Sequence, residues 1–90
     1  MSPLEQLFRL EIEFHRCLRT QAPDTGDAAS LHASFALQSG YEPLLHSLGA
    51  VTARDIETLR ERLTLSGDPR DILVARDSLK QLLGLRLLEL

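Results

Sequence analysis

The chain has 90 residues, a length that suits one small domain, and we expect a single domain over residues 1–90. A hydrophobic content of 43% excludes a disordered chain, because that much apolar surface can offset the entropy lost on folding. The formal charge of −3 gives no general electrostatic attraction to nucleic acid or to anionic lipid.

Signals for the start and end of helices recur along the chain and predict an all-α fold. The segment Ser2-Pro3-Leu4-Glu5 has the pattern of a capping box with proline at the first helical position, and it predicts a helix to about residue 20. Proline, aspartate and glycine predict a loop over residues 21–26. A second helix is expected over residues 27–40 and a short third helix over residues 42–48.

The second half of the chain repeats these signals. Thr52, followed by an acidic residue in the first turn, predicts the start of a fourth helix that ends near Ser66-Gly67. Asp68 and Pro69 then predict a fifth helix that reaches Leu90 and is longer than the others. The expected architecture is a compact bundle of four to five helices with a long Leu-rich C-terminal helix.

Leucine dominates the expected last helix, where seven of the final twelve residues are leucine. At about 100° per residue, one broad stripe of this helix contains Ile72, Ala75, Leu79, Leu82, Leu83, Leu87 and Leu90. Val74, Leu85 and Leu88 project from nearly the opposite side. A helix that is apolar on two sides requires a second surface to cover it. We therefore predict partner-binding residues in this helix: Val74, Leu82, Leu85, Leu88 and Leu90.

One pair of polar residues lies on the apolar side of the first helix. Glu11 and His15 are four residues apart, so their side chains share a face with the neighbouring leucines and phenylalanines. The interpretation we favour is a structural, buried polar pair at a helix seam. A metal or acid–base site is the alternative, and it would need further ligands, such as His32 or His46, brought in by folding.

Motifs for enzyme chemistry are missing from the sequence. We find no GxSxG, HExxH or CxxC pattern and no glycine-rich phosphate loop between a strand and a helix. The single cysteine, Cys17, cannot form a disulfide within this sequence, and we expect a buried thiol. The sequence thus predicts a protein that is not an enzyme, with no catalytic residues, no cofactor and no metal.

Residues 44–63 carry the outline of a helix-turn-helix, with a glycine in the turn and an apolar anchor in the second helix. The turn is one residue longer than that motif prefers. The second helix also has no net positive charge with which to meet phosphates. A DNA-binding regulator that uses residues 44–63 is therefore the alternative function, and we regard nucleic acid as an unlikely partner.

The leading functional hypothesis is a small protein–protein interaction module, such as an adaptor, a regulator or a chaperone-like subunit. Its partner would be a second copy, giving a homodimer, or another protein, giving a heterodimer. Charged residues interrupt each apolar run before the ~18–20 residues that a membrane span needs, so we expect no membrane partner and a cytoplasmic location. The ratio of nine arginines to one lysine is typical of a GC-rich, bacterial genome.

Overall fold

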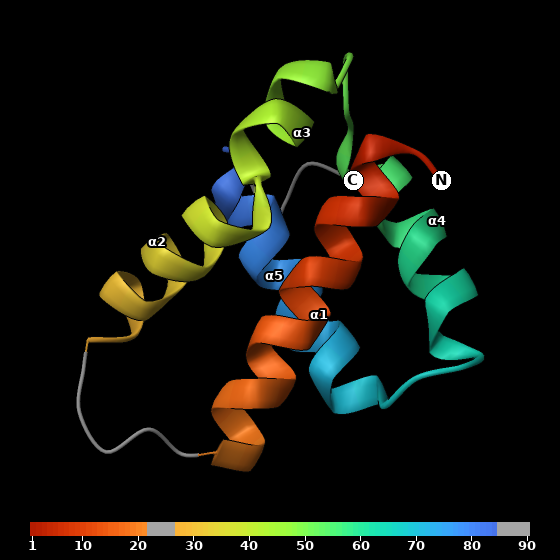
Figure 1. The fold of residues 1–90 in the computed structure, drawn as a ribbon. Helices are drawn as coiled ribbons and strands as arrows, with labels where there is room; N and C mark the ends of the chain where they lie inside the picture. The colour runs from red at the N-terminus through yellow and green to blue at the C-terminus, as the bar shows by residue number, and fades with distance from the viewer. Residues whose placement is uncertain (22–26, 85–90) are drawn as a thin grey trace.

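The computed structural model describes residues 1–21 and 27–84, and in this part of the chain every regular element is an α-helix (Figure 1). This confirms the predicted all-α bundle. The helices in chain order are α1 (Pro3–Gln21), α2 (Ala28–Ser39), α3 (Tyr41–Ser47), α4 (Ala53–Thr64) and α5 (Pro69–Leu82).

Helix α1 lies at the centre of the arrangement and contacts α5, α3 and α2, while α4 packs on α5 (Figure 1). Two long-range contacts show that α1 and α5 run antiparallel. Arg19, near the end of α1, contacts Asp71 at the start of α5. Glu11, in the middle of α1, contacts Ser78 in the second half of α5. The bundle therefore consists of an α1–α5–α4 portion and, across α1, an α2–α3 portion.

The core is mainly aliphatic and lies between α1, α4 and α5, with Tyr41 of α3 added to it. Its fully or almost fully buried members are Leu7, Phe8, Tyr41, Ile56, Leu63, Ile72, Ala75 and Leu79. Three of them, Ile72, Ala75 and Leu79, belong to the stripe that the sequence predicted for the last helix. Leu82 of that stripe is instead 37% exposed, because it occupies the last helical residue, beyond the contacts that cover Leu79.

Local capping explains why the helices begin where they do. The side chain of Asp27 accepts a hydrogen bond from the amide of Ala29, and Thr52 forms a reciprocal capping box with Asp55. Gly40 adopts a left-handed backbone with φ 78°, and it both ends α2 and precedes α3. The third helix consequently begins at Tyr41 rather than at the predicted residue 42.

The prediction of a C-terminal helix longer than the others is wrong. Helix α5 has 14 residues and ends at Leu82, whereas α1 has 19. Gly84 has a left-handed backbone with φ 73°, and its amide donates to the carbonyl of Gln81 in a tight terminal turn. Leucine content favours a helix across this point, but the glycine allows the backbone to leave helical geometry at no steric cost.

We expect Leu79→Ala to lower the free energy of unfolding by about 2–5 kcal/mol, because Leu79 is completely buried and its truncation leaves a cavity. Leu65→Ala is the matched control, since that leucine is 88% exposed and should change stability by less than about 0.5 kcal/mol. Urea denaturation followed by circular dichroism measures both. Similar effects for the two variants would contradict the described core.

Candidate functional site

The carboxylate of Glu11 lies where α1, α2 and α5 meet, and it has no solvent exposure. Its Oε1 is 2.7 Å from Nε2 of His32, on α2. Its Oε2 accepts a hydrogen bond of 3.1 Å from the hydroxyl of Ser78, on α5. Two helices besides its own thus supply the polar contacts that a buried carboxylate requires.

His15, one turn after Glu11, lies beside the same carboxylate. Its Nε2 is 3.5 Å from Oε2 of Glu11 and forms no hydrogen bond with any residue that the structure describes. Glu11 and His15, which the sequence paired, are therefore neighbours, but the contact of His15 with the carboxylate is longer than that of His32. The shorter contact comes from His32, which spacing along one helix could not place there because it is 21 residues away.

Aromatic rings enclose the histidine side of this cluster. The ring of His32 meets Phe14 edge-on at a centroid distance of 4.9 Å and Tyr41 at 5.9 Å. The hydroxyl of Tyr41 is buried and makes no hydrogen bond within residues 1–21 and 27–84. The cluster of Glu11, His15, His32, Tyr41 and Ser78, hereafter the Glu11 cluster, is thus a polar site walled by rings.

Electrostatics favour the ionised form of Glu11. Burial alone would raise the pKa of Glu11, but contacts with His15, His32 and Ser78 outweigh it, so the pKa is lowered from its usual value. Burial, and then the negative charge of Glu11, raises the pKa of Tyr41. The cluster therefore holds one negative charge, which accepts hydrogen bonds from His32 and Ser78.

The Glu11 cluster is not arranged as a metal site in the part of the chain that the structure describes. No group of three or more metal-ligating side chains among the described residues is arranged to hold a metal ion. Because Glu11 is completely buried, its carboxylate cannot reach a substrate in this conformation. His46, the other candidate ligand, lies on the exposed surface of α3 beside Glu42. The geometry supports a structural role for the cluster.

Two further ionic contacts hold α5 to its neighbours. Arg19 donates two hydrogen bonds, of 2.9 and 2.8 Å, to the carboxylate of Asp71, and this bidentate contact lowers the pKa of Asp71. On the other side, Lys80 donates to Glu57 of α4 at 2.9 Å. Burial would raise the pKa of Glu57, but hydrogen bonds from Arg60 and Lys80 lower it.

The structure places residues 44–63 on two separate sides of the bundle. Helix α3 packs on α1 and α2, whereas α4 packs on α5, and the two lie apart in Figure 1. Two arginines of α4 are engaged with acidic side chains: Arg60 with Glu57 at 2.7 Å, and Arg62 with Glu5. This arrangement is unlike a helix-turn-helix, in which the two helices pack together and the second presents donors to DNA.

Helix α5 exposes apolar side chains on its outer surface. Val74 is 50% exposed and Leu82 is 37% exposed, and both were predicted to bind a partner. Leu73 is 42% exposed, although the sequence pattern did not single it out. The other predicted partner-binding residues, Leu85, Leu88 and Leu90, lie outside the described residues. We call Leu73, Val74 and Leu82 the α5 surface.

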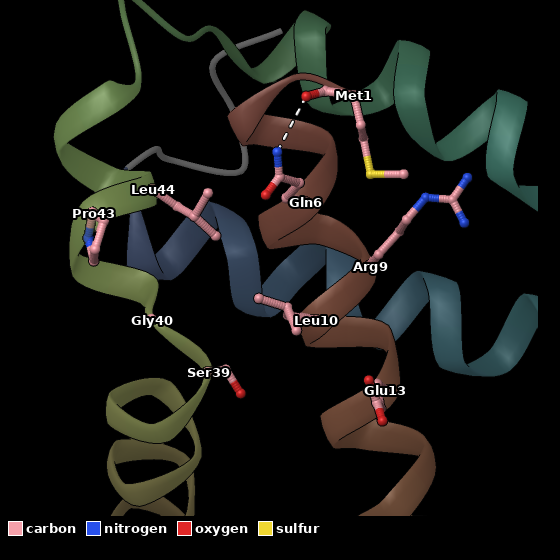
Figure 2. A pocket seen from close by; sticks show the side chains of 9 residues that line it. All are labelled: Met1, Gln6, Arg9, Leu10, Glu13, Ser39, Gly40, Pro43 and Leu44. Carbon is pink, nitrogen blue, oxygen red and sulfur yellow. Dashed lines mark hydrogen bonds between the residues drawn. The ribbon is translucent and has the colours of Figure 1, made fainter.

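The surface also has hollows beside α1. One of about 440 Å³ lies between the start of α1 and the α2–α3 junction (Figure 2), and its lining mixes charged, polar and apolar side chains. Beside it, the Nε2 of Gln6 donates to the carbonyl of Met1 at 3.1 Å. A second hollow, of about 290 Å³, lies between α1 and α2 and is mainly apolar. Cys17, half-buried rather than fully buried as expected, lines it as a free thiol.

Comparisons with known proteins return no matching family model, curated protein or solved structure, so functional inference rests on the geometry above. Within the described residues, no helix has the length and apolar character needed to cross a membrane.

The pKa of Glu11 is lower in the folded protein than its usual value, so the unfolded state binds more protons at acidic pH. Its stabilising contribution is therefore present above the pKa of the unfolded carboxyl and is lost as pH falls through the folded pKa. We expect Glu11→Gln to lower the free energy of unfolding by about 1.5–3 kcal/mol at neutral pH, because hydrogen bonds to a charged acceptor are lost.

Urea denaturation at several pH values measures both effects. Glu11→Gln should also make stability depend less steeply on acidic pH than in the wild type. Glu42→Gln is the control, because that carboxylate also lies beside a histidine but its side chain is 84% exposed. Equal changes in the free energy of unfolding for the two substitutions would show that the buried contacts of Glu11 add no more stability than an exposed pair.

Proposed function

We propose that this protein is a small, non-catalytic protein–protein interaction module that binds its partner through the α5 surface. The observation that carries the proposal is the exposure of three large apolar side chains on α5, although two of its charged side chains are buried. Its charged residues Asp71 and Lys80 are 4% and 3% exposed, whereas Leu73, Val74 and Leu82 face solvent. Ion pairs hold Asp71 and Lys80 inward, and the three apolar side chains share the outer side of the helix with the exposed Arg70 and the partly exposed Asp77.

An apolar helix face of this kind fits the face of another helix, because helix-on-helix packing covers side chains of about this size and spacing. Burying the exposed parts of the three side chains would contribute on the order of 2–4 kcal/mol, given about 1.5–3 kcal/mol for each fully buried aliphatic side chain. This is less than association costs. The proposal therefore includes Leu85, Leu88 and Leu90 in the same interface, as the sequence predicts.

The partner we propose is a helix with an apolar stripe, belonging to a second copy of this chain or to another protein. The α5 surface serves either, since a two-fold interface uses the same patch on both copies. A cytoplasmic setting belongs to the same proposal. It is supported by the single free cysteine.

We expect the double variant Val74→Glu and Leu82→Glu to weaken association, because two charges would be placed in an apolar interface. Light scattering on a size-exclusion column over a hundredfold dilution measures self-association. For another protein, retention from host lysate should fall for the double variant. The matched control is Leu37→Glu with Leu65→Glu, since those leucines are 82% and 88% exposed but lie outside α5.

Circular dichroism must show that the double variant retains its helices. Global unfolding would place Val74 and Leu82 in the core and contradict the proposed interface. Equal mass and equal retention for the wild type, the double variant and the control would also overturn the proposal.

A further inference from the structure

Helix α2 is held to the bundle by little buried apolar surface. None of its 12 residues is buried, in contrast to α4 and α5. Leu37 is 82% exposed, and Phe35 and Ala36 are only partly buried against the core. Because tertiary packing supplies most of the stability of a helix in a protein, α2 depends on few contacts to stay docked.

One of these contacts is polar. Among the described residues, the 2.7 Å contact of His32 with Glu11 is the one side-chain hydrogen bond that joins α2 to another helix. The acceptor is fully buried, whereas the side chain of His32 is 24% exposed. The contact thus joins His32, a partly exposed donor on α2, to the fully buried carboxylate of Glu11 on α1.

Gly40 provides a pivot at the end of α2. Its backbone is left-handed, with φ 78°, and no atom lies within 4 Å of the position that a Cβ would occupy. The next residue, Tyr41, is 3% exposed and anchors α3 in the core. The chain can therefore bend at Gly40 while α3 keeps its place.

The titratable groups that face Glu11 come from α1, α2 and α3. His15 lies at 3.5 Å on α1 itself, His32 at 2.7 Å on α2, and the Tyr41 hydroxyl lies on α3. The group from α5 is Ser78, a donor that does not titrate in this range. Glu13 adds a second negative charge that acts on Tyr41.

We propose that α2 is an acid-released latch that closes over the Glu11 cluster. In the closed state, the ring N–H of His32 donates a hydrogen bond to the ionised carboxylate of Glu11. When Glu11 takes up a proton from solvent, it no longer offers His32 a charged acceptor, and α2 swings away about Gly40. This motion uncovers the ring of Phe14 and, with it, Cys17 and Leu18, the α1 side chains that line the mainly apolar hollow between α1 and α2.

The direction of the pH response follows from the contacts. His32 favours the ionised form of Glu11, through its hydrogen bond and its charge. By reciprocity, the ionised form favours the docked position of α2. Docking is therefore strongest above the ordinary carboxyl range and weakens as pH falls through it. The proposal is independent of the α5 surface, because none of its residues takes part.

Amide hydrogen exchange by NMR, corrected for the pH dependence of the chemical exchange rate, tests the latch on the whole protein. Between about pH 6 and about pH 3, we expect protection in the middle of α2 to fall by roughly tenfold or more relative to protection in α5. Glu11→Gln should show reduced protection of α2 at both pH values, with little change between them. His32→Asn should likewise reduce the protection of α2 at both pH values, with little change between them, while the amides of α5 stay protected.

Glu42→Gln is the matched control, because it removes an exposed carboxylate beside His46 and should leave the response of α2 unchanged. Parallel loss of protection in α2 and α5 would mean that α2 opens only on global unfolding, and would overturn the proposal. A wild-type pH response in His32→Asn would overturn it as well. His32→Asn keeps the Glu11 carboxylate, so it remains informative if Glu11→Gln fails to fold.

Discussion

The arrangement of the helices depends on the burial of one carboxylate at their junction. A charge without solvent exposure costs several kcal/mol unless hydrogen bonds from the protein replace those from water. Glu11 receives these contacts from His32 of α2 and Ser78 of α5. Neither helix can shift far from α1 without leaving the charge unsatisfied, so this polar contact sets the register of α1 with α5 and the position of α2.

Polar contacts also determine which side of α5 faces solvent. The bidentate contact of Arg19 with Asp71 ties its first turn to α1, and the contact of Lys80 with Glu57 ties its last turn to α4. Asp71 and Lys80 therefore point inward beside the buried stripe of Ile72, Ala75 and Leu79, whereas Arg70 stays exposed and Asp77 partly exposed. The outer side of α5 also carries the exposed Leu73, Val74 and Leu82, and these apolar side chains are the basis of the proposed interaction function.

The two portions of the bundle differ in what holds them together. The α1–α5–α4 portion has a closely packed aliphatic core and inter-helical ion pairs. In the α2–α3 portion, Tyr41 anchors α3 in that core, whereas α2 is held by the partly buried Phe35 and Ala36, by contacts between rings and by the Glu11 cluster. Local opening in proteins occurs where few apolar contacts are buried. The α1–α5–α4 portion can therefore stay folded and present the proposed α5 surface while α2 responds to protonation of Glu11.

The sequence by itself determined the start of four helices and the buried stripe of Ile72, Ala75 and Leu79 in α5, because caps and the 3.6-residue period act within a few residues. Ser2, Asp27, Thr52 and Asp68 all precede helices as expected. The tertiary structure alone decided that His32, 21 residues from Glu11, is its close partner. It also decided that α5 ends at Leu82, whereas its leucine content had predicted a helix that reaches Leu90. These outcomes depend on packing between distant segments and on the backbone angles of a single glycine, which a one-helix pattern does not contain.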